Sequence, residues 1–362
     1  MKPTIKIFLL VSLALVIFLG LECKKKPTEN DDDDKPGRRD YTWTIDTLSY
    51  PGSLQTTMYD MYAVNAKNIY VVGHNDQNRG HMYHYDGNTW KPVGLHTSEG
   101  GQISGAISIF AIYGFGANDI WAVGSRSFSN PTPPPIWYDS SLIIHFDGNQ
   151  WSEVSIVRGK GTLQGIWGSS ANDVWAGGVY GTLYHYNGIV WTKIDADTSL
   201  WFLTFGGKAN EQYALAYNRK DTAGYLATIH YLLSYQETSW TIIDYFAELS
   251  YAQWTFGHYS IRYMENEFYS AGYGVFKKKN NSWNTLFDSG NNTFLDVFGT
   301  RKKNIFAVGI YGIVYHYNGT DWKKIQELYN VSLSYFSSGW TNEKEVFILA
   351  SDNYKTYIYH GK

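Results

Sequence analysis

Residues 172–191, with the sequence NDVWAGGVYGTLYHYNGIVW, contain the pattern that decides the fold of this chain. The apolar run Val174–Ala176 lies between Asn172-Asp173 and a glycine pair, so it predicts a short buried strand bounded by turns. Asn187-Gly188 then supplies positive φ angles for a two-residue hairpin turn, and Trp191 follows on the next strand. The stretch therefore predicts short antiparallel strands joined by tight turns.

The same pattern recurs along the chain at intervals of about 45 residues, the length of a four-stranded propeller blade. Its first half returns at residues 68–73, 118–124 and 304–309. Its second half leads each time to a tryptophan on the outer strand, where a large ring covers the seam between neighbouring blades. These tryptophans are Trp90, Trp151, Trp191, Trp240, Trp283 and Trp322.

The two ends of the chain together supply one more copy. Residues 357–362 match residues 83–88 but stop at the hairpin turn, and residues 41–45 resemble the missing outer strand, as it occurs at 190–194. We therefore expect an all-β fold, a seven-bladed β-propeller of four-stranded antiparallel blades over residues 41–362. An N-terminal strand completes the last blade. A count of six or eight blades stays open, because two copies are degenerate.

The composition fits such a fold and excludes several function classes. Hydrophobic residues make up 44% of the chain and aromatic residues 17%, and the 35 glycines suit many tight turns. The net charge of −3 gives no field that would recruit nucleic acid. Because Cys23 is the single cysteine, an intrachain disulfide and a cysteine-based metal site are excluded.

The N-terminus predicts export. A positively charged start precedes residues 7–21, an uncharged run that is shorter than the roughly 20 residues of a membrane-spanning helix. Residues 1–22 are therefore predicted to be a signal peptide, and Cys23 behind them resembles the lipidated cysteine of bacterial lipoproteins. Residues 23–40 predict a disordered tether. The alternative is a plain signal peptide, or an uncleaved anchor with an incidental cysteine.

The repeat resembles those of secreted and lipoprotein β-propellers of bacteria. The elements that carry this resemblance are NDVWAGG, YHYNG and the tryptophan of residues 172–191. The same copy is similar to a Kelch repeat, and residues 86–90, DGNTW, resemble the Asp-box of sialidase-like propellers. The resemblance implies the architecture and names no activity, because propellers host many unrelated functions.

Four histidines stand at one position of the repeat: His84, His145, His185 and His316. The weaker copies carry other residues there, namely Ser234, Lys277 and Ile358. A residue that recurs at one repeat position is predicted to bond a neighbouring strand or turn of its own blade. Metal binding would need ligands that converge on one point, so no metal and no cofactor are expected.

The irregular loops on one face are the candidates for binding, because function tends to lie on loops held by a rigid scaffold. Three short turns contribute one tyrosine each: Tyr180, Tyr273 and Tyr311. Two longer insertions contribute His74, His81, Arg126, Trp137 and Tyr138. Rings with flanking polar groups suit stacking on a sugar or a protein patch. The alternative is that these rings merely cap the blades.

A catalytic hypothesis rests on Asp60 and Asp296, which fall at matching positions on the innermost strands of two blades. If both face the central channel, they could serve as acid and base or bind a cation. The other copies are expected to place less polar residues there, namely Ala111, Gly165, Leu203 and Trp254.

The leading hypothesis is a monomeric, non-catalytic binding or scaffolding propeller at the cell envelope that recognises a glycan or a protein through its loop face. Its expected location is the bacterial outer membrane, cell surface or periplasm, with membrane contact through the lipid anchor only. The alternative is a carbohydrate-active enzyme, a hydrolase or lyase that uses the channel carboxylates. An enzyme would bring ionisable groups with shifted pKa values together in a cleft, whereas a binding module would show an aromatic patch.

Overall fold

The computed structural model describes residues 36–103, 105–154, 161–222, 225–236, 238–248, 254–288, 290, 292–330, 332–333 and 335–362. Pro36–Lys362 forms a compact unit. Apart from one 3₁₀ turn, Gln326–Leu328, the regular elements among the described residues are strands. No helix in this part of the chain is long and apolar enough to cross a membrane. The predicted signal peptide and Cys23 lie outside the described residues.

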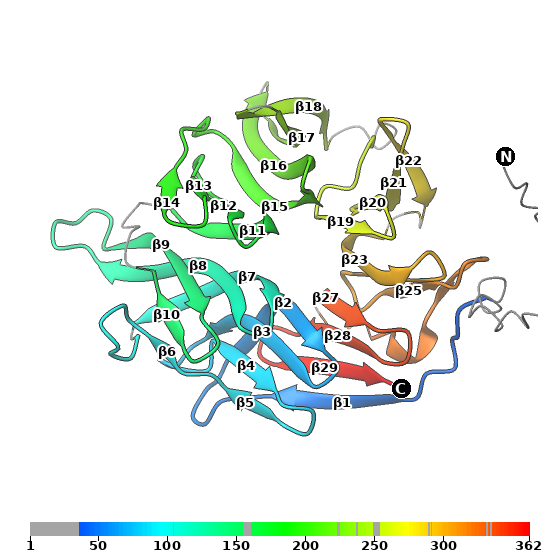
Figure 1. Ribbon diagram of the computed structural model, residues 1–362, viewed down its shortest axis with the longest axis horizontal. Coiled ribbons are helices and arrows are strands. Elements are labelled where there is room, and N and C mark those ends of the chain that lie inside the picture. Colours follow the sequence, from blue (N-terminus) through cyan, green and yellow to red (C-terminus); the bar gives the residue numbers. More distant parts are fainter. Residues whose placement is uncertain are drawn as a thin grey trace, which may run out of the picture. The chain divides into compact units, whose positions relative to one another are not determined.

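Five separate antiparallel sheets have four strands each (Figure 1). Four of them follow chain order: β11(Leu163–Ser170) to β12(Asp173–Gly178), β13(Leu183–Tyr186) and β14(Trp191–Lys193); β15(Trp201–Lys208) to β16(Glu211–Thr222), β17(Tyr225–Gln236) and β18(Ser239–Ala247); β19(Ser260–Met264) to β20(Glu267–Ala271), β21(Val275–Lys279) and β22(Ser282–Phe287); β23(Phe294–Arg301) to β24(Asn304–Gly309), β25(Val314–Tyr317) and β26(Trp322–Lys324). The fifth joins the two chain ends: β27(Tyr335–Thr341), β28(Val346–Ser351), β29(Thr356–Gly361) and β1(Trp43–Leu48).

The remaining nine strands form one continuous sheet. It contains two four-stranded antiparallel groups: β2(Thr56–Asn65), β3(Asn68–Asn75), β4(Met82–Tyr85) and β5(Trp90–Pro92), then β7(Ala106–Gly116), β8(Asp119–Ser129), β9(Trp137–Phe146) and β10(Trp151–Glu153). A single residue pair, His74 with Ser108, joins β3 to β7. The short strand β6(Leu95–His96) pairs in parallel with β10.

The prediction of seven separate four-stranded blades is therefore wrong in its count. Five sheets are separate, and the other two four-stranded groups share one sheet. The physical reason is the length of β7, which has 11 residues where β11 has 8. The longer strand reaches β3 and pairs with it. The prediction of four-stranded antiparallel blades is confirmed.

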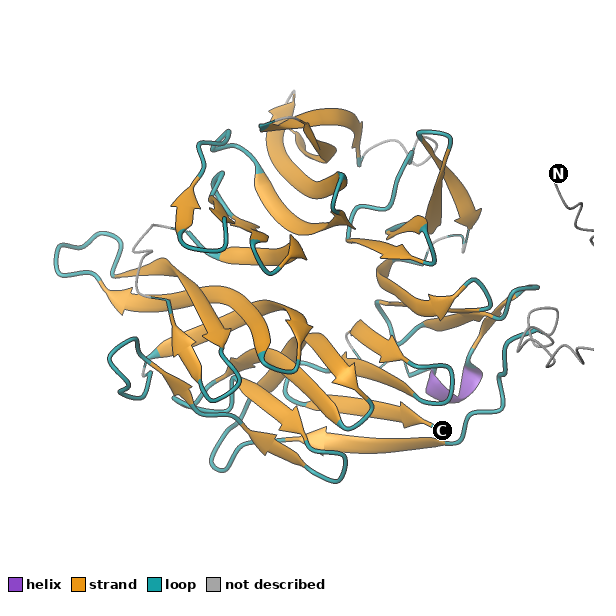
Figure 2. Ribbon diagram, in the orientation of Figure 1, coloured by secondary structure: helices purple, strands orange, loops and turns teal. Residues whose placement is uncertain are grey.

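The innermost strands close into a ring. Strand β2 contacts β7, and the contacts continue through β11, β15, β19 and β23 to β27, which contacts β2 again. Figure 2 shows these strands around the middle of the compact unit. Apolar side chains from neighbouring sheets fill the space between them. Trp167 and Trp175 of one sheet, for example, pack with Phe202 and Phe205 of the next. The fold is a β-propeller.

The outer tryptophans lie where the repeat predicts them and cover the seams between sheets. Trp191 of β14 meets Trp121 of β8 with ring centroids 5.4 Å apart. Trp240 of β18 meets Trp175 of β12 at 5.3 Å, in a perpendicular arrangement. Trp90 of β5 instead donates from its indole nitrogen to Asp46 of β1, at 3.2 Å. Each ring thus ties its blade to the preceding one.

The N-terminal strand closes the ring, as predicted. β1 pairs antiparallel with β29 from Trp43 opposite Gly361 to Leu48 opposite Thr356. The alignment of the C-terminal copy was wrong by two residues, because His360 pairs with Phe347 as His84 pairs with Tyr70. A shift of two residues keeps every side chain on its face of the strand, so the apolar pattern alone does not reveal it. His360, and not Ile358, is the repeated histidine of the last blade.

Residues 36–40, which fall in the predicted tether, contact the propeller. The amide of Gly37 donates to the carbonyl of Asn318 at 2.7 Å. The guanidinium of Arg39 lies 2.7 Å from the carboxylate of Asp321 and also donates to the carbonyl of His316. The compact unit therefore includes residues 36–40.

Candidate functional site

The repeated histidines hold the hairpins of their own blades. Each ring nitrogen Nε2 lies within 3 Å of an Asx or Glu side chain at the start of a neighbouring strand: His84 with Asn68, His145 with Asp119, His185 with Asp173, His316 with Asn304 and His360 with Glu345. Each ring also stacks on an aromatic side chain of the paired strand, as His185 does on Trp175 at 4.2 Å. This arrangement agrees with the predicted framework role.

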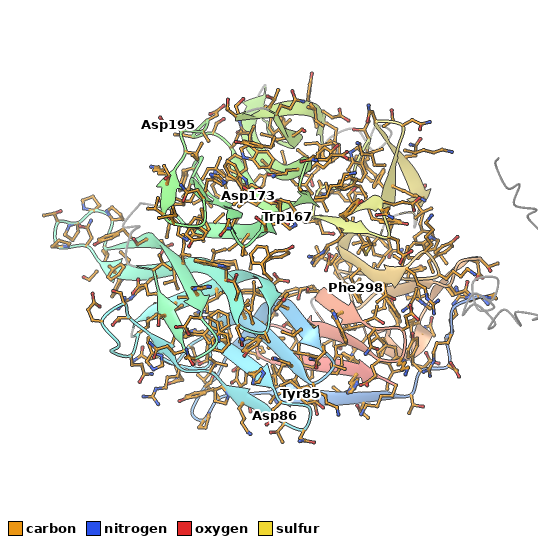
Figure 3. The ribbon with its side chains drawn as sticks, viewed as in Figure 1. Tyr85, Asp86, Trp167, Asp173, Asp195 and Phe298 are labelled. Atoms are coloured by element: carbon orange, nitrogen blue, oxygen red, sulfur yellow. The ribbon has the colours of Figure 1, made fainter. Side chains whose placement is uncertain are left out.

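Asp173, labelled in Figure 3, extends this framework to the next blade. Its second carboxylate oxygen accepts a hydrogen bond from Gln212 of β16 at 2.9 Å. Burial acts to raise the pKa of Asp173, but hydrogen bonds from Ser169, His185 and Gln212 outweigh it and leave the pKa lowered. The ionised form is therefore the one that the fold stabilises. Among the described residues, no group of three or more possible ligands could hold a metal ion.

The two candidate catalytic carboxylates also serve the framework. Asp60 of β2 accepts from the hydroxyl of Ser338 of β27 at 2.9 Å and from the amide of Ile112 of β7 at 3.0 Å. It thus bonds to both neighbouring blades. Asp296 of β23 is 2% exposed and forms a two-point ion pair with Arg262 of β19, with N–O distances of 3.1 and 2.9 Å.

The pairing of each inner strand with the next strand of its blade shows which residues occupy the position of Asp60 and Asp296 in the other blades. Asp60 pairs with Val72 and Asp296 with Val308, in each case the residue before the glycine that follows the buried strand. By the same register, the equivalents in the other polar copies are Thr204, Ser260 and Ser338. The prediction of Leu203 and Trp254 at this position is therefore wrong, while Ala111 and Gly165 are correctly placed. The position is polar in most blades because it bonds one inner strand to the next, as the hydroxyl of Ser260 does when it accepts from the amide of Val297.

Arg262 is a third charged residue of this inner group, and the sequence did not indicate it. Burial acts to lower the pKa of its guanidinium, but Asp296 and Asp60 outweigh that effect and raise it. Burial raises the pKa of Asp60, and the charge of Arg262 opposes that rise. Arg262 is therefore paired directly with Asp296, and its charge also acts on Asp60. Its signal in the sequence was weak, because the fifth copy of the repeat is degenerate.

The three candidate tyrosines of the short turns are not equivalent. Tyr180 and Tyr311 occupy the same kind of turn, both with φ of 56°, and expose 63% and 66% of their surfaces. Tyr273 instead stacks on Trp254 with ring centroids 3.9 Å apart, and its hydroxyl donates to Glu248 at 2.7 Å. The three short turns therefore do not present three similar tyrosines.

A continuous row of rings runs from Tyr180 to Tyr273 instead. Successive ring centroids lie 3.9 to 6.4 Å apart. We call this row the aromatic arc; its members are Tyr180, Trp201, Tyr217, His230, His258, Tyr273 and Trp254. It crosses from the turn after β12, over the start of β15 and the middle of β16 and β17, to the turn after β20. Tyr259, which is 37% exposed, lies 4.3 Å from the ring of His258.

The two histidines of the arc are neutral and deeply placed. His230 is 5% exposed and His258 is 1% exposed, and neither ring has a hydrogen-bond partner among the described residues. Burial lowers the pKa of His230 to about 4 and lowers that of His258 well below its ordinary value. They therefore act as flat, uncharged rings that support the more exposed members of the arc.

The other candidates lie on the fused sheet. Trp137 and Tyr138, 61% and 40% exposed, stand at the start of β9, where Tyr138 stacks with Phe128. Arg126 lies over the ring of Phe128 at 5.0 Å and 3.4 Å from Glu153. His74 and His81 lie 6.2 Å apart, ring to ring, beside the turn after β3. No ring contact joins these groups, or Tyr311, to the aromatic arc within the described residues.

No protein-family model and no curated protein sequence matches the chain. Its backbone is similar to that of a YCF48 protein bound to D1 peptide, with a TM-score of 0.60 and 15% identity over 90% of this chain and 99% of that one. YCF48 from Cyanidioschyzon merolae gives a TM-score of 0.56 and 14% identity over 86% and 98%. The WD40 propeller domain of Doa1 gives 0.50 and 11% over 86% and 97%. These likenesses show the propeller fold.

Proposed function

We propose that the chain is a non-catalytic binding propeller that holds a protein partner on the aromatic arc. The observation that carries this proposal is the continuity of the arc over three neighbouring sheets, with exposed rings at Tyr180 and Tyr259. Rigid aromatic rings provide large contact area at little entropic cost, and they dominate the energetics of many interfaces.

The bonding of the inner carboxylates supports a non-catalytic role. A general acid and base must reach the substrate and exchange protons with it. Asp60 is committed to Ser338 and Ile112, and Asp296 is committed to Arg262. Replacing these partners with substrate would break bonds between inner strands, so the carbohydrate-active enzyme is the weaker alternative.

A protein is favoured over a glycan as the partner. The similar YCF48 structure was solved with a peptide, which supports peptide recognition on this architecture. A sugar site would need hydrogen-bonding side chains grouped around a stacking ring. The two histidines of the arc are instead buried and the rings between its ends are partly covered, which suits apolar side chains of a protein.

We further propose that the ring counts seven structural units. The nine-stranded sheet would supply two of them, because only His74 and Ser108 join its two four-stranded groups. The seven inner strands that contact one another in sequence support this count.

The proposed setting is the cell envelope, with residues 1–22 as a signal peptide, Cys23 as the lipid attachment point and a monomeric propeller beyond it.

The arc can be tested with a matched pair of tyrosines. The chain would be used to capture a partner from an envelope extract, and the affinity of the identified partner would be measured for the Tyr180→Ala, Trp201→Ala and Tyr311→Ala variants. We expect the first two to weaken binding about thirtyfold, the usual effect of losing a buried aromatic anchor. Tyr311→Ala should bind as the unchanged protein does, because Tyr311 has the same turn and exposure outside the arc.

Two outcomes would overturn this assignment. Unchanged affinity in Trp201→Ala would remove the arc from the interface. If no protein partner is captured and Trp201→Ala abolishes binding to a glycan array, the ligand of the arc is a sugar and not a protein.

A further inference from the structure

A second site lies on the fused sheet, away from the aromatic arc. The turn after β3 and the connection from β5 to β7 enclose a cavity of about 180 Å³. Its lining includes Tyr50, Arg79, His81, Leu95, His96 and Gln102. The ring of Tyr50 packs against Gly80, whose φ of 82° bends the turn toward it. The cavity is thus built by two loops that the rest of the repeat does not require.

His81 leaves a buried hydrogen-bond donor at this cavity. The side chain is 2% exposed, and its Nδ1 lies 3.3 Å from the backbone nitrogen of Asn75. An amide N–H can only donate, so Nδ1 accepts and the ring proton is assigned to Nε2. Nε2 is buried and has no partner among the described residues. Burial, assisted by His74, lowers the pKa of His81 to about 4, so the ring is neutral at pH 7.

The charge of the cavity is positive. Arg79 stands at its exposed rim and donates to the side-chain carbonyl of Gln102, a neutral partner. None of the described residues that line the cavity is a carboxylate. His96 donates from Nδ1 to the carbonyl of Trp151 at 3.2 Å. One cation and one buried donor match a single negative charge better than a dianion.

The remaining lining is apolar. Leu95, Ile103 and Ile107 are at most 6% exposed and bound the inner part of the cavity. Such a wall suits a short carbon chain attached to a polar head. At about 180 Å³, the cavity has room for a head group with a few carbon atoms and not for a folded segment.

We infer that this cavity binds a carboxylate, which accepts from the guanidinium of Arg79 and from Nε2–H of His81 while its carbon chain packs on Leu95, Ile103 and Ile107. The carboxylate belongs to a small acid or to a peptide, at a side chain or at the chain end. This site is independent of the aromatic arc, because the arc lies on the sheets formed by β11–β22.

Calorimetric titration of the full chain with propionate tests the inference, and propionamide serves as the uncharged control of equal shape. We expect propionate to bind and propionamide to bind at least about tenfold more weakly, because a charge-assisted bond to Arg79 is lost. Arg79→Gln should weaken propionate binding about tenfold or more. Lys91→Gln, which removes an exposed cation of the same blade, should leave it unchanged. His81→Phe should weaken binding in protein whose melting is unchanged.

Three peptides distinguish the sources of the carboxylate. Tighter binding of acetyl-Ala-Ala than of its C-terminal amide would assign a chain end. Tighter binding of acetyl-Ala-Asp-Ala-amide would assign an acidic side chain, and binding of propionate alone would assign a small acid. The inference is overturned if propionate does not bind at millimolar concentrations, if propionamide binds equally well, or if Arg79→Gln binds propionate as the unchanged protein does.

Discussion

At the scale of the residue, the inner-strand position of Asp60 and Asp296 shows what pattern matching can and cannot find. The sequence correctly places both acids at one repeat position, because each precedes a clear copy of the buried strand. It misses Thr204 by one residue, because the fourth copy of the repeat is degenerate and offers no clear motif by which to align that strand. It misses Ser260 because no clear copy surrounds it. The partners of the acids on other blades come only from the tertiary structure.

Buried histidines make the stability of the chain depend on pH. Burial lowers the pKa of His81 and His230 to about 4 and that of His316 to about 3, whereas an unfolded histidine titrates near its ordinary value of 6.5. Between those values the unfolded chain binds protons that the native chain does not, so stability falls as the pH falls. For His230 alone this amounts to about 3 kcal/mol across the window.

Thermal unfolding followed from pH 7 to pH 4.5 would measure this effect. We expect the midpoint to fall steadily below about pH 6.5, and the fall to be smaller in His230→Phe than in Lys91→Gln, which leaves every histidine in place. The raised pKa of Asp60 acts with the opposite sign, because its native carboxyl gains a proton first. A midpoint that stays constant down to pH 4.5 would contradict the neutral, buried state of these rings.

At the scale of the element, the outer strands carry the seam contacts and the turns carry the exposed rings. The sequence predicts both from glycine and tryptophan positions. It does not predict that Tyr180 and Tyr273 differ, because this depends on contacts of Tyr273 with Trp254 and Glu248, which are distant from it in sequence. The aromatic arc likewise depends on contacts between elements, and no periodic pattern in the sequence predicts it.

Strand β1 provides the element-scale prediction. Deleting residues 41–48 removes six paired positions with β29 and the buried side chain of Leu48, which is 3% exposed. Burial of one leucine contributes about 1.5 to 3 kcal/mol, and the loss also exposes the edge of β29. We expect the whole propeller to melt at a lower temperature in a single transition. Deletion of residues 24–35 serves as the control, and equal melting of the two deletions would refute the closure.

At the scale of the whole molecule, closure makes the sheets mutually dependent. Core clusters draw side chains from neighbouring sheets, as Leu48 and Met58 pack with Phe347 and Leu349 across the junction of the chain ends. In the fused sheet, one cluster joins the two four-stranded groups. A single four-stranded sheet could not bury its two apolar faces alone. The loop face is then held rigid, so that the arc and the carboxylate cavity keep their shapes without a partner.

The proposed anchoring is also a property of the whole molecule. Replacing Cys23 by Ser removes the thiol that lipidation requires, while leaving the propeller untouched. We expect cell fractionation to find the unchanged protein with membranes and Cys23→Ser in the soluble fraction, since an acyl chain adds about 0.8 kcal/mol of membrane affinity per buried CH₂. If Cys23→Ser remains with the membranes, the lipid-anchor proposal is refuted.

The sequence by itself determined the repeating unit, the outer tryptophans, the framework histidines and the pairing of the two chain ends. These are local patterns of period two with turn residues at fixed spacing, so each copy reports them independently. Tertiary structure alone decided the fusion of two groups into one sheet, the partners of Asp60 and Asp296, the aromatic arc and the cavity of Arg79 and His81. All four depend on which particular residues of different blades come into contact, and the repeat pattern does not specify those residues.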